Sequence, residues 1–321
     1  MLAVTIGDAN GVGPEILLKA FCDKKLPGKF IAVGDYSALE LCRDKLGYTA
    51  ELRCVASPVD YTPGVINVLD AALLEKSRII PGEISREVAA ASRQYVVTAT
   101  ELARQGLFGA VVTLPVNKEG IRLTDPVFTG HTELIAELCG QDGYTMMLAS
   151  DKLTVTHVST HVSMQEACNV KKARVLEVIR LTNEALSRFK PSPKIAVAGL
   201  NAHSGEAGAF GRQEIDEINP AVEAAIAEGI NTTGALPPDT VFWRAAKGEF
   251  DAVVCMYHDQ GHIPMKLLDF EGGVNVTLGL DVVRTSVDHG TAFDIAWQGK
   301  ASAGSFIAAY EYGMKIQKKI F

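Results

Sequence analysis

The chain has 321 residues, of which 47% are hydrophobic and 21% charged, and its formal net charge is −7. This composition excludes an extended disordered protein and fits packed domains of about 150 residues, of which we expect two. The negative charge argues against broad nucleic-acid or membrane-surface binding, since both require a positive face. The start MLAVTIGD lacks the basic residues and long apolar stretch of a signal peptide, so we expect a cytoplasmic protein.

Short apolar, β-branched runs alternate along the chain with longer segments of helical spacing. Strands are predicted over residues 2–7, 30–34, 110–114, 145–149, 153–159, 194–201, 251–258 and 274–280. Helices are predicted over residues 83–105, 131–139, 171–189, 212–228 and 239–247. Pro14 indicates the first turn of a further helix, and Ser163 with Glu166 fits a capping box. The alternation predicts a parallel sheet layered with helices.

The N-terminal motif TIGDANGVGPEI, residues 5–16, runs from a strand through a glycine-rich turn into a helix. It lacks the GxGxxG spacing of a dinucleotide-binding turn. Glu15 would also place a negative charge at the helix end that should receive pyrophosphate. A tight structural turn therefore explains this motif at least as well as a binding loop does.

A second motif, FTGHTELIAEL at residues 128–138, places Gly130, His131 and Thr132 just before a predicted helix. Backbone N–H groups and a hydroxyl at a helix start can hold an anion such as a phosphate. The alternative is that Thr132 serves only as the N-cap of the helix.

Three histidines, His161, His203 and His258, each stand at the end of a different predicted strand. Strand ends in an α/β fold converge on one cleft, so these side chains are predicted to bind one divalent metal ion. Capping of each strand by hydrogen bonding is the alternative for any one of them. His157 precedes His161 by four residues on the same predicted strand, about 13 Å away, and cannot join it on one ion.

Residues 257–301 set several polar side chains among apolar ones. Lys266 and Arg284 interrupt apolar runs, and a buried cation is costly unless it meets an anion. A phosphorylated or carboxylated substrate would supply that anion. Ordinary intramolecular salt bridges are the alternative.

Seven motifs together resemble the 4-hydroxythreonine-4-phosphate dehydrogenase family, NAD-dependent enzymes of pyridoxine (vitamin B6) biosynthesis. These motifs are TIGDANGVGPEI, LPVNK, FTGHTE, NAHSGEAGAFGRQEID, LPPDTVF, YHDQG and RTSVDHGTAFDIA, and they span the chain. The resemblance implies an α/β fold of two α/β/α domains, similar to isocitrate and isopropylmalate dehydrogenases, with the active site in the cleft between them. We expect one domain on the nucleotide side, residues 1–125 plus 265–321, and one with the metal ligands and the dimer contacts, residues 126–264.

The resemblance also implies roles for individual residues. The metal ligands are His161, His203 and His258, in a site built across a homodimer interface and holding one Zn, Mg, Co or Mn ion. The substrate-binding residues are His131, Thr132, Lys266, Asn275 and Arg284. The NAD loop, similar to the HGSAPDIAG-type loop of the isopropylmalate dehydrogenases, includes Asp288, His289, Gly290 and Thr291. Our own candidates for proton handling, or for orienting a histidine, are Asp239 and Asp259.

Departures from the family pattern bear on the substrate. Residues 7–11 read GDANG where GDPAG is usual, and the segments THVSTHVS and YHDQGHIPMK resemble the D-threonate or D-erythronate 4-phosphate dehydrogenases of sugar-acid catabolism. We therefore expect oxidation of the C3 hydroxyl of such a four-carbon acid, followed by β-decarboxylation. The alternatives are 4-phosphohydroxy-L-threonine as substrate, a three-histidine zinc hydrolase, and a ligand-binding protein without activity.

Overall fold

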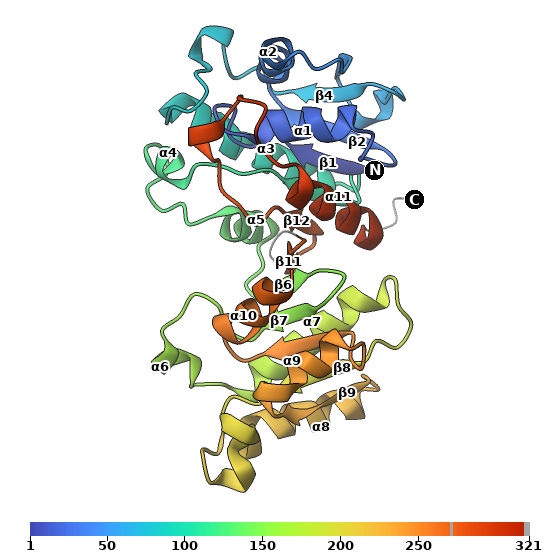
Figure 1. Cartoon of the computed structure of the whole chain (residues 1–321), viewed down its shortest axis with the longest axis vertical. Helices are drawn as coiled ribbons and strands as arrows, with labels where there is room; N and C mark the ends of the chain where they lie inside the picture. Colours follow the sequence, from blue (N-terminus) through green and yellow to red (C-terminus); the bar gives the residue numbers. More distant parts are fainter. Residues whose placement is uncertain (270–271, 318–321) are drawn as a thin grey trace. The chain divides into compact units, whose positions relative to one another are not determined.

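The computed structural model describes residues 1–269 and 272–317. Its contacts divide the chain into two compact units, Met1–Asp142 with Leu280–Phe321, and Gly143–Gly279 (Figure 1). Residues 270–271 and 318–321, which are expected in the first domain, lie outside the described residues. Within the described ranges, no helix combines the length and apolar character needed to cross a bilayer.

Along the chain, the boundaries of the two units fall at other residues than those expected from the sequence. Residues 126–142 belong to the first unit, because helix α5 (His131–Cys139) packs against helix α3 (Arg86–Arg104). Residues 265–279 belong to the second unit, because strand β11 (Val274–Leu278) pairs with strand β6 (Thr145–Ala149). Helix packing and strand pairing set these limits.

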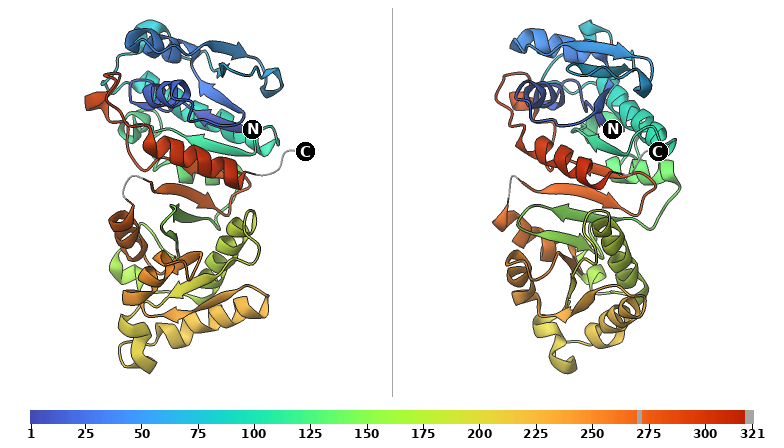
Figure 2. Two further views of the ribbon diagram at one scale, coloured as in Figure 1. Left: turned by 45° about the vertical axis from the view of Figure 1, so that its right-hand side comes forward. Right: turned by 90° about the vertical axis from the view of Figure 1, so that its right-hand side faces the viewer.

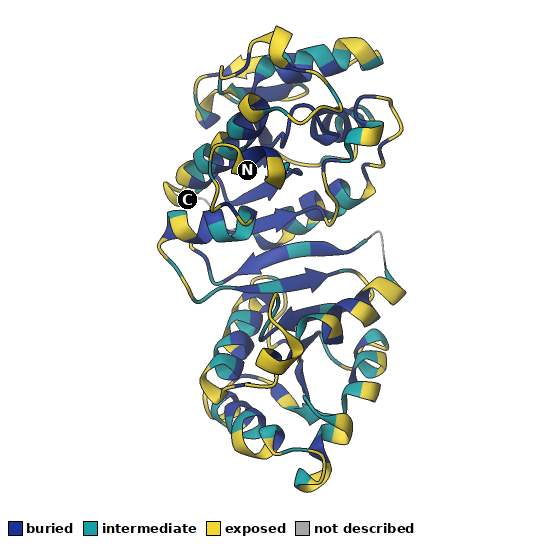
Figure 3. Cartoon of the chain, turned by 90° about the vertical axis from the view of Figure 1, so that its left-hand side faces the viewer, coloured by how far each residue is buried: buried dark blue, intermediate teal, exposed yellow. Residues whose placement is uncertain are grey.

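The first unit is built on parallel strands in the order β3-β4-β2-β1-β5-β12. Their bounds are β1 Leu2–Thr5, β2 Phe30–Gly34, β3 Leu52–Val55, β4 Ile66–Asp70, β5 Ala110–Thr113 and β12 Arg284–Ser286. Every residue of β1, β2 and β5 is buried, as expected of parallel strands that are covered on both faces (Figure 3).

Six α-helices of the described residues surround these strands. They are α1 Gly13–Cys22, α2 Tyr36–Leu46, α3, α4 Lys118–Arg122, α5 and α11 Gly304–Ile316, with 3₁₀ turns at Pro58–Asp60, Lys76–Arg78 and Phe293–Ile295. Helix α3 packs on β1, β2 and β5, while α11 packs on β5 and β12 and contacts α1 (Figure 1). Pro14 lies in the first turn of α1, as the sequence predicts.

The second unit has the strand order β11-β6-β7-β10-β8-β9. The bounds of the strands not yet given are β7 Thr154–His157, β8 Ile195–Ala198, β9 Thr232–Leu236 and β10 Ala252–Cys255. The prediction of a parallel sheet is wrong for β6, which runs antiparallel to both β7 and β11. A short turn joins β6 to β7, and two strands so joined cannot run parallel without a crossover.

The helices of the second unit cover both faces of its strands (Figure 2). They are α6 Met164–Ala167, α7 Lys172–Ser187, α8 Asn219–Ala227, α9 Pro238–Ala246 and α10 His258–Leu268, with a 3₁₀ segment Ala202–Gly208 and a π-helical turn Glu214–Ile218. Alternate strand residues face opposite sides: Val197 joins the core under α7 and α8, and Ala196 the core under α9 and α10. The predicted capping box of Ser163 and Glu166 opens α6.

Candidate active site

Arg284 opens strand β12, and its side chain is buried, with only 4% of the residue surface exposed. Its Nε and Nη2 donate hydrogen bonds to the hydroxyl of Thr113 at the end of β5, at 3.1 and 3.0 Å. Its Nη1 donates to the hydroxyl of Thr132, at 3.1 Å. Burial lowers the pKa of Arg284 to about 10, against the opposing effect of Glu133, so the guanidinium stays charged at neutral pH. This buried cation beside two hydroxyls is suited to bind an anion.

Thr132 lies in the first turn of α5, whose N-cap is Gly130. Its hydroxyl is therefore not the N-cap that the alternative interpretation requires, and it accepts a hydrogen bond from Arg284 instead. The backbone of Gly130 is extended. A Cβ at this position would lie 3.3 Å from Lys118 Nζ and 2.9 Å from Glu133 Oε2. Lys118 therefore lies close to Gly130. The free backbone N–H groups at the start of α5 lie beside Thr132, which contacts Arg284.

His131 is the first residue of α5, and its buried Nε2 has no hydrogen-bond partner among the described residues. Burial, with Arg284 and Lys118 nearby, lowers the pKa of this histidine well below its ordinary value. The imidazole is therefore neutral at pH 7. A neutral ring with one buried, unsatisfied nitrogen is suited to bind a polar group of a ligand.

The predicted nucleotide loop follows β12 in the same unit. Asp288, His289 and Gly290 are exposed, while Thr291 is buried. The carbonyl of Thr291 accepts a hydrogen bond from Val12 N, at 3.0 Å, and lies 2.9 Å from the position of a Cβ on Gly11. A side chain at residue 11 would collide with that carbonyl. The glycine-rich turn of the N-terminal motif therefore supports the predicted nucleotide loop.

Glu15 has no role toward a phosphate in this arrangement. It is fully buried, and its Oε1 accepts a hydrogen bond from Ala301 N, at 2.9 Å. The carboxylate thus connects α1 to the segment after the predicted nucleotide loop. This contact agrees with the structural interpretation of the N-terminal motif.

In the second unit, His258 opens α10, three residues after the end of β10. Its Nδ1 lies 2.6 Å from Asp259 Oδ1, and the hydrogen bond between them lowers the pKa of Asp259. A carboxylate on Nδ1 leaves Nε2 as the coordinating nitrogen, which is the usual arrangement at metal sites. Asp259 was predicted either to handle protons or to orient a histidine, and this contact supports the second role.

His161 lies in the loop after β7, beyond the strand end at His157, and is exposed. Its ring centre is 5.7 Å from that of His258. Two imidazoles bound to one ion, each with its nitrogen about 2 Å from the metal, have ring centres about 5 Å apart. These two side chains are therefore close to a shared-ligand spacing.

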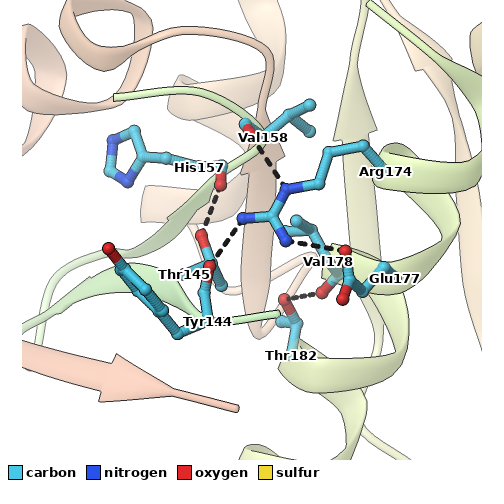
Figure 4. Close-up of polar contacts among 8 residues, drawn as sticks. All are labelled: Tyr144, Thr145, His157, Val158, Arg174, Glu177, Val178 and Thr182. Atoms are coloured by element: carbon cyan, nitrogen blue, oxygen red, sulfur yellow. Dashed lines mark hydrogen bonds and ion pairs between the residues drawn. The ribbon is translucent and has the colours of Figure 1, made fainter. Parts of the chain in front are cut away.

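Arg174 of α7 binds the backbone at the end of β7, where the loop of His161 begins (Figure 4). It donates from Nε to the carbonyl of Val158 at 3.3 Å and from Nη2 to that of Tyr144 at 2.7 Å, and its Nη1 is paired with Glu177. The hydroxyl of Thr145 donates to the carbonyl of His157. These hydrogen bonds therefore hold the backbone at the start of the loop that carries His161.

Two further histidines pack against His258. The ring of His262 is stacked on it, with centres 3.5 Å apart and an interplanar angle of 11°. His157 is fully buried, and burial lowers its pKa to about 3. It is the last residue of β7, so the regular strand assumed for His157 and His161 ends between them. Both rings act as packing neighbours of His258.

His203 lies in the 3₁₀ segment after β8, in an exposed position, and its Nδ1 is 3.9 Å from Asp239 Oδ2 of α9. Among the described residues, no group of three His, Cys, Asp or Glu side chains is arranged to hold a metal ion. The donor types fit a divalent cation, and His161 and His258 have a suitable spacing. One chain does not by itself gather the three predicted ligands.

The other two predicted substrate residues differ in their surroundings. Asn275 of β11 donates from Nδ2 to Met146 Sδ at 3.2 Å, and its buried Oδ1 has no hydrogen-bond partner within residues 1–269 and 272–317. Lys266 is exposed on α10, so the expectation that it is buried among strand residues is wrong. Pro264 and Gly261 obscured this helix in the sequence, because both residues disfavour helix interiors.

Some residues of the site were missed from the sequence alone. Lys118 ends the LPVNK motif and Thr113 precedes it, but nothing in the sequence connects either of them to Arg284 or His131. Glu214 and Gln260 lie in the NAHSGEAGAFGRQEID and YHDQG motifs, beside residues that were singled out. A role for Glu214 and Gln260 is indicated by their hydrogen bonds in the folded protein, which are described below.

Comparison with known proteins places this geometry in a family. Residues 28–313 match the family described as pyridoxal phosphate biosynthetic protein PdxA. D-threonate 4-phosphate dehydrogenase of Pectobacterium atrosepticum is 42% identical over 322 residues, 98% of this chain and 99% of that protein. 4-hydroxythreonine-4-phosphate dehydrogenase of Desulforapulum autotrophicum is 41% identical over 96% of this chain and 93% of that protein.

A crystal structure of 4-hydroxythreonine-4-phosphate dehydrogenase from Klebsiella pneumoniae is similar throughout. It is 42% identical, with a TM-score of 0.90, and the match covers 99% of this chain and 98% of that one. A dehydrogenase is favoured over a three-histidine hydrolase, because the similar proteins are named as dehydrogenases over nearly the full chain. The chain belongs to the PdxA family and is an oxidoreductase of the dehydrogenase type.

Proposed function

We propose that this protein oxidises the C3 hydroxyl of a 4-phosphorylated four-carbon hydroxy acid with NAD, assisted by a divalent metal ion. The product is a ketone β to a carboxylate, which then loses CO2. The observation that carries the proposal is the buried guanidinium of Arg284, with the hydroxyls of Thr113 and Thr132 beside it. Such a charge is suited to hold a phosphate or carboxylate of the substrate.

In this proposal Arg284 and Thr132 bind an anionic end of the substrate, together with His131, Lys266 and Asn275. The buried His131 Nε2 and Asn275 Oδ1, which have no partner in the described part of the chain, are hydrogen-bonding positions that a bound ligand would satisfy. Binding at a group remote from C3 would orient the reacting carbon. Because His131 is neutral at pH 7, it would serve as a hydrogen-bond partner and not as a charge.

His161 and His258 of one chain and His203 of a second copy would hold the metal ion. Support for this pairing comes from the proximity of His161 to His258 and from the exposed position of His203. Asp259 would orient His258, and Asp239, 3.9 Å from His203, would orient or exchange a proton with that ring. When bound, the cation would lower the pKa of the substrate hydroxyl and polarise the ketone. The resulting assembly is a homodimer.

NAD would bind at the loop of Asp288, His289, Gly290 and Thr291. Support comes from the contact of Thr291 with the glycine-rich turn at Gly11 and Val12. The hydrogen bond from Val12 N to the carbonyl of Thr291 holds the loop against this turn. Thr291 would be the buried anchor of the loop, and the exposed residues before it would contact the nucleotide.

For the substrate itself we favour D-threonate 4-phosphate or D-erythronate 4-phosphate. The segments THVSTHVS and YHDQGHIPMK support this choice, and so does the similarity to the Pectobacterium enzyme. The alternative is 4-phosphohydroxy-L-threonine, the intermediate of pyridoxal phosphate biosynthesis, because relatives named for that activity are nearly as similar. The two substrate classes differ in the group at C2, a hydroxyl or an amine.

The test is a steady-state comparison of the three phosphorylated substrates on the purified protein. NADH formation would be followed by absorbance and CO2 release by a coupled assay, after chelation and again after adding Zn²⁺, Mg²⁺, Co²⁺ or Mn²⁺. We expect the highest kcat/KM with one of the two sugar acids, and equal amounts of NADH and CO2. NADH without CO2 would remove the decarboxylation step, and no NADH from any substrate with any metal would contradict the proposal.

A further inference from the structure

His203 lies in a turn of unusual backbone conformation. In the segment Ala202–Gly208, His203 has a φ of 50°, Ser204 of 55°, Glu206 of 44° and Ala207 of 55°. These φ values lie in the left-handed region, which residues other than glycine rarely adopt. A run of such residues persists only where surrounding contacts hold it. The position of His203 therefore depends on groups outside the turn.

The carboxylate of Glu214 is one such group. It is buried, with 2% of the residue exposed, and its Oε1 accepts hydrogen bonds from Leu200 N and Asn201 N, both at 2.7 Å. Its Oε2 accepts from Asn201 Nδ2, at 2.9 Å. The same Oε2 lies 2.7 Å from the position of a Cβ on Gly205, so the carboxylate lies directly against the turn. Hydrogen bonds to a buried charge are the strong kind.

Gln260 holds the other side of this segment. Its Nε2 donates to the carbonyl of Gly199 at 2.7 Å, and its Oε1 accepts from Met256 N at 2.6 Å. One buried amide thus joins the end of β8, which leads to His203, to the end of β10, which leads to His258. Glu214 and Gln260 together fix both ends of the short connection from Gly199 to the turn.

We propose that Glu214 is a positioning residue: its carboxylate holds the left-handed turn, and thereby presents the His203 imidazole for metal binding. Gln260 sets the base of that turn relative to the start of α10. The inference rests on the proposed function in one respect, the role of His203 as a metal ligand. A carboxylate that only stabilised the fold would leave metal affinity unchanged in every variant that still folds.

The test compares Glu214→Ala and Glu214→Gln with the control Glu223→Ala, an exposed glutamate on α8, all in the full-length protein. The affinity for Co²⁺ would be measured by competition with a chromophoric chelator, and backbone hydrogen exchange would be followed over residues 200–210. We expect Glu214→Ala to weaken Co²⁺ binding by about 10- to 100-fold. We also expect faster exchange over residues 200–210, whereas Glu223→Ala should match the wild type.

Glu214→Gln keeps one oxygen for the two backbone N–H groups but loses an acceptor for the amide of Asn201. We expect it to keep the thermal midpoint of the wild type within a few degrees and still to bind Co²⁺ more weakly. Wild-type affinity in both Glu214 variants would overturn the positioning role. So would unchanged hydrogen exchange over residues 200–210 in Glu214→Ala.

A double-mutant cycle with His203→Ala separates this inference from the proposed function. If Glu214 acts through His203, Glu214→Gln should cause no further loss of Co²⁺ affinity in the His203→Ala protein. Additive losses would overturn the positioning role and leave the metal assignment intact. Wild-type Co²⁺ affinity in His203→Ala would instead overturn the metal assignment, and the exchange measurement would then decide whether Glu214 holds the turn.

Discussion

The guanidinium of Arg284 donates two hydrogen bonds to a single hydroxyl, that of Thr113. The two residues are 171 positions apart in the sequence. Strand β12 pairs directly with β5, so the two side chains meet inside the first unit. The contact holds a buried charge in one orientation. Stability and activity should therefore both respond to residue 113.

Thr113→Val should lower the free energy of unfolding of the first unit by about 1 to 3 kcal/mol, since two N–H groups of a buried charge lose their acceptor. Urea denaturation would be followed by the fluorescence of Trp297, which is buried in this unit, after Trp243→Phe removes the other tryptophan. Thr113→Ser keeps the hydroxyl and is the matched control. Equal unfolding midpoints for Val and wild type would contradict this role of Thr113.

Arg284→Ala should lower kcat/KM on the phosphorylated substrate by at least about tenfold, because charge-assisted contacts contribute about 1.5 to 3 kcal/mol each. Arg284→Lys should not restore it, since an ammonium cannot reproduce the two-sided contact with Thr113 and Thr132. The control is Arg180→Ala, an exposed arginine paired with Glu228.

The same kinetics on a dephosphorylated analogue identify the group that Arg284 binds. If it holds the phosphate, Arg284→Ala should cause a much smaller loss on the analogue than on the substrate. An equal proportional loss on both compounds would show that Arg284 binds the carboxylate or serves the fold.

Subunit mixing should reveal which chain supplies each metal ligand. His203→Ala mixed with His161→Ala, after demonstrated subunit exchange, should recover about a quarter of wild-type activity, since half of the dimers would carry one intact site of two. His161→Ala mixed with His258→Ala should recover none, because these two side chains lie together in one chain. Recovery in the second mixture but not in the first would contradict this division of the ligands.

Asp8 should make the stability of the first unit depend on pH. Burial raises its pKa from 3.8 to about 7, against a hydrogen bond from Asn10 N. The folded protein therefore retains a proton that the unfolded chain releases, so stability is full below pH 4 and falls as the pH rises to about 7. Asp8→Asn should remove this dependence, which amounts to at most about 4 kcal/mol.

Urea midpoints of the wild type and Asp8→Asn, measured at intervals from pH 5 to pH 8, would test this expectation. The variant should gain stability relative to the wild type as the pH rises. Parallel profiles of the two proteins would show that Asp8 does not titrate in this range.

Local patterns in the sequence were enough to predict much of the framework. Strand β2 and helix α5 occur at the predicted residues, because apolar periodicity reflects burial that is decided within one element. Strand β12 has three residues, and β3 exposes its two central ones, so neither carries a clear pattern. Helix α10 was missed because it contains both Gly261 and Pro264.

The candidate site divides in the same way. The sequence alone indicated the candidate residues, since histidines near strand ends are potential metal ligands and an arginine in an apolar run is costly to bury without a partner. The folded structure was needed to show that Thr113 and Thr132 accept hydrogen bonds from Arg284, that His161 approaches His258, and that Lys266 is exposed. The reason is physical: strand pairing and helix packing bring together residues whose separation along the chain carries no information about distance in space.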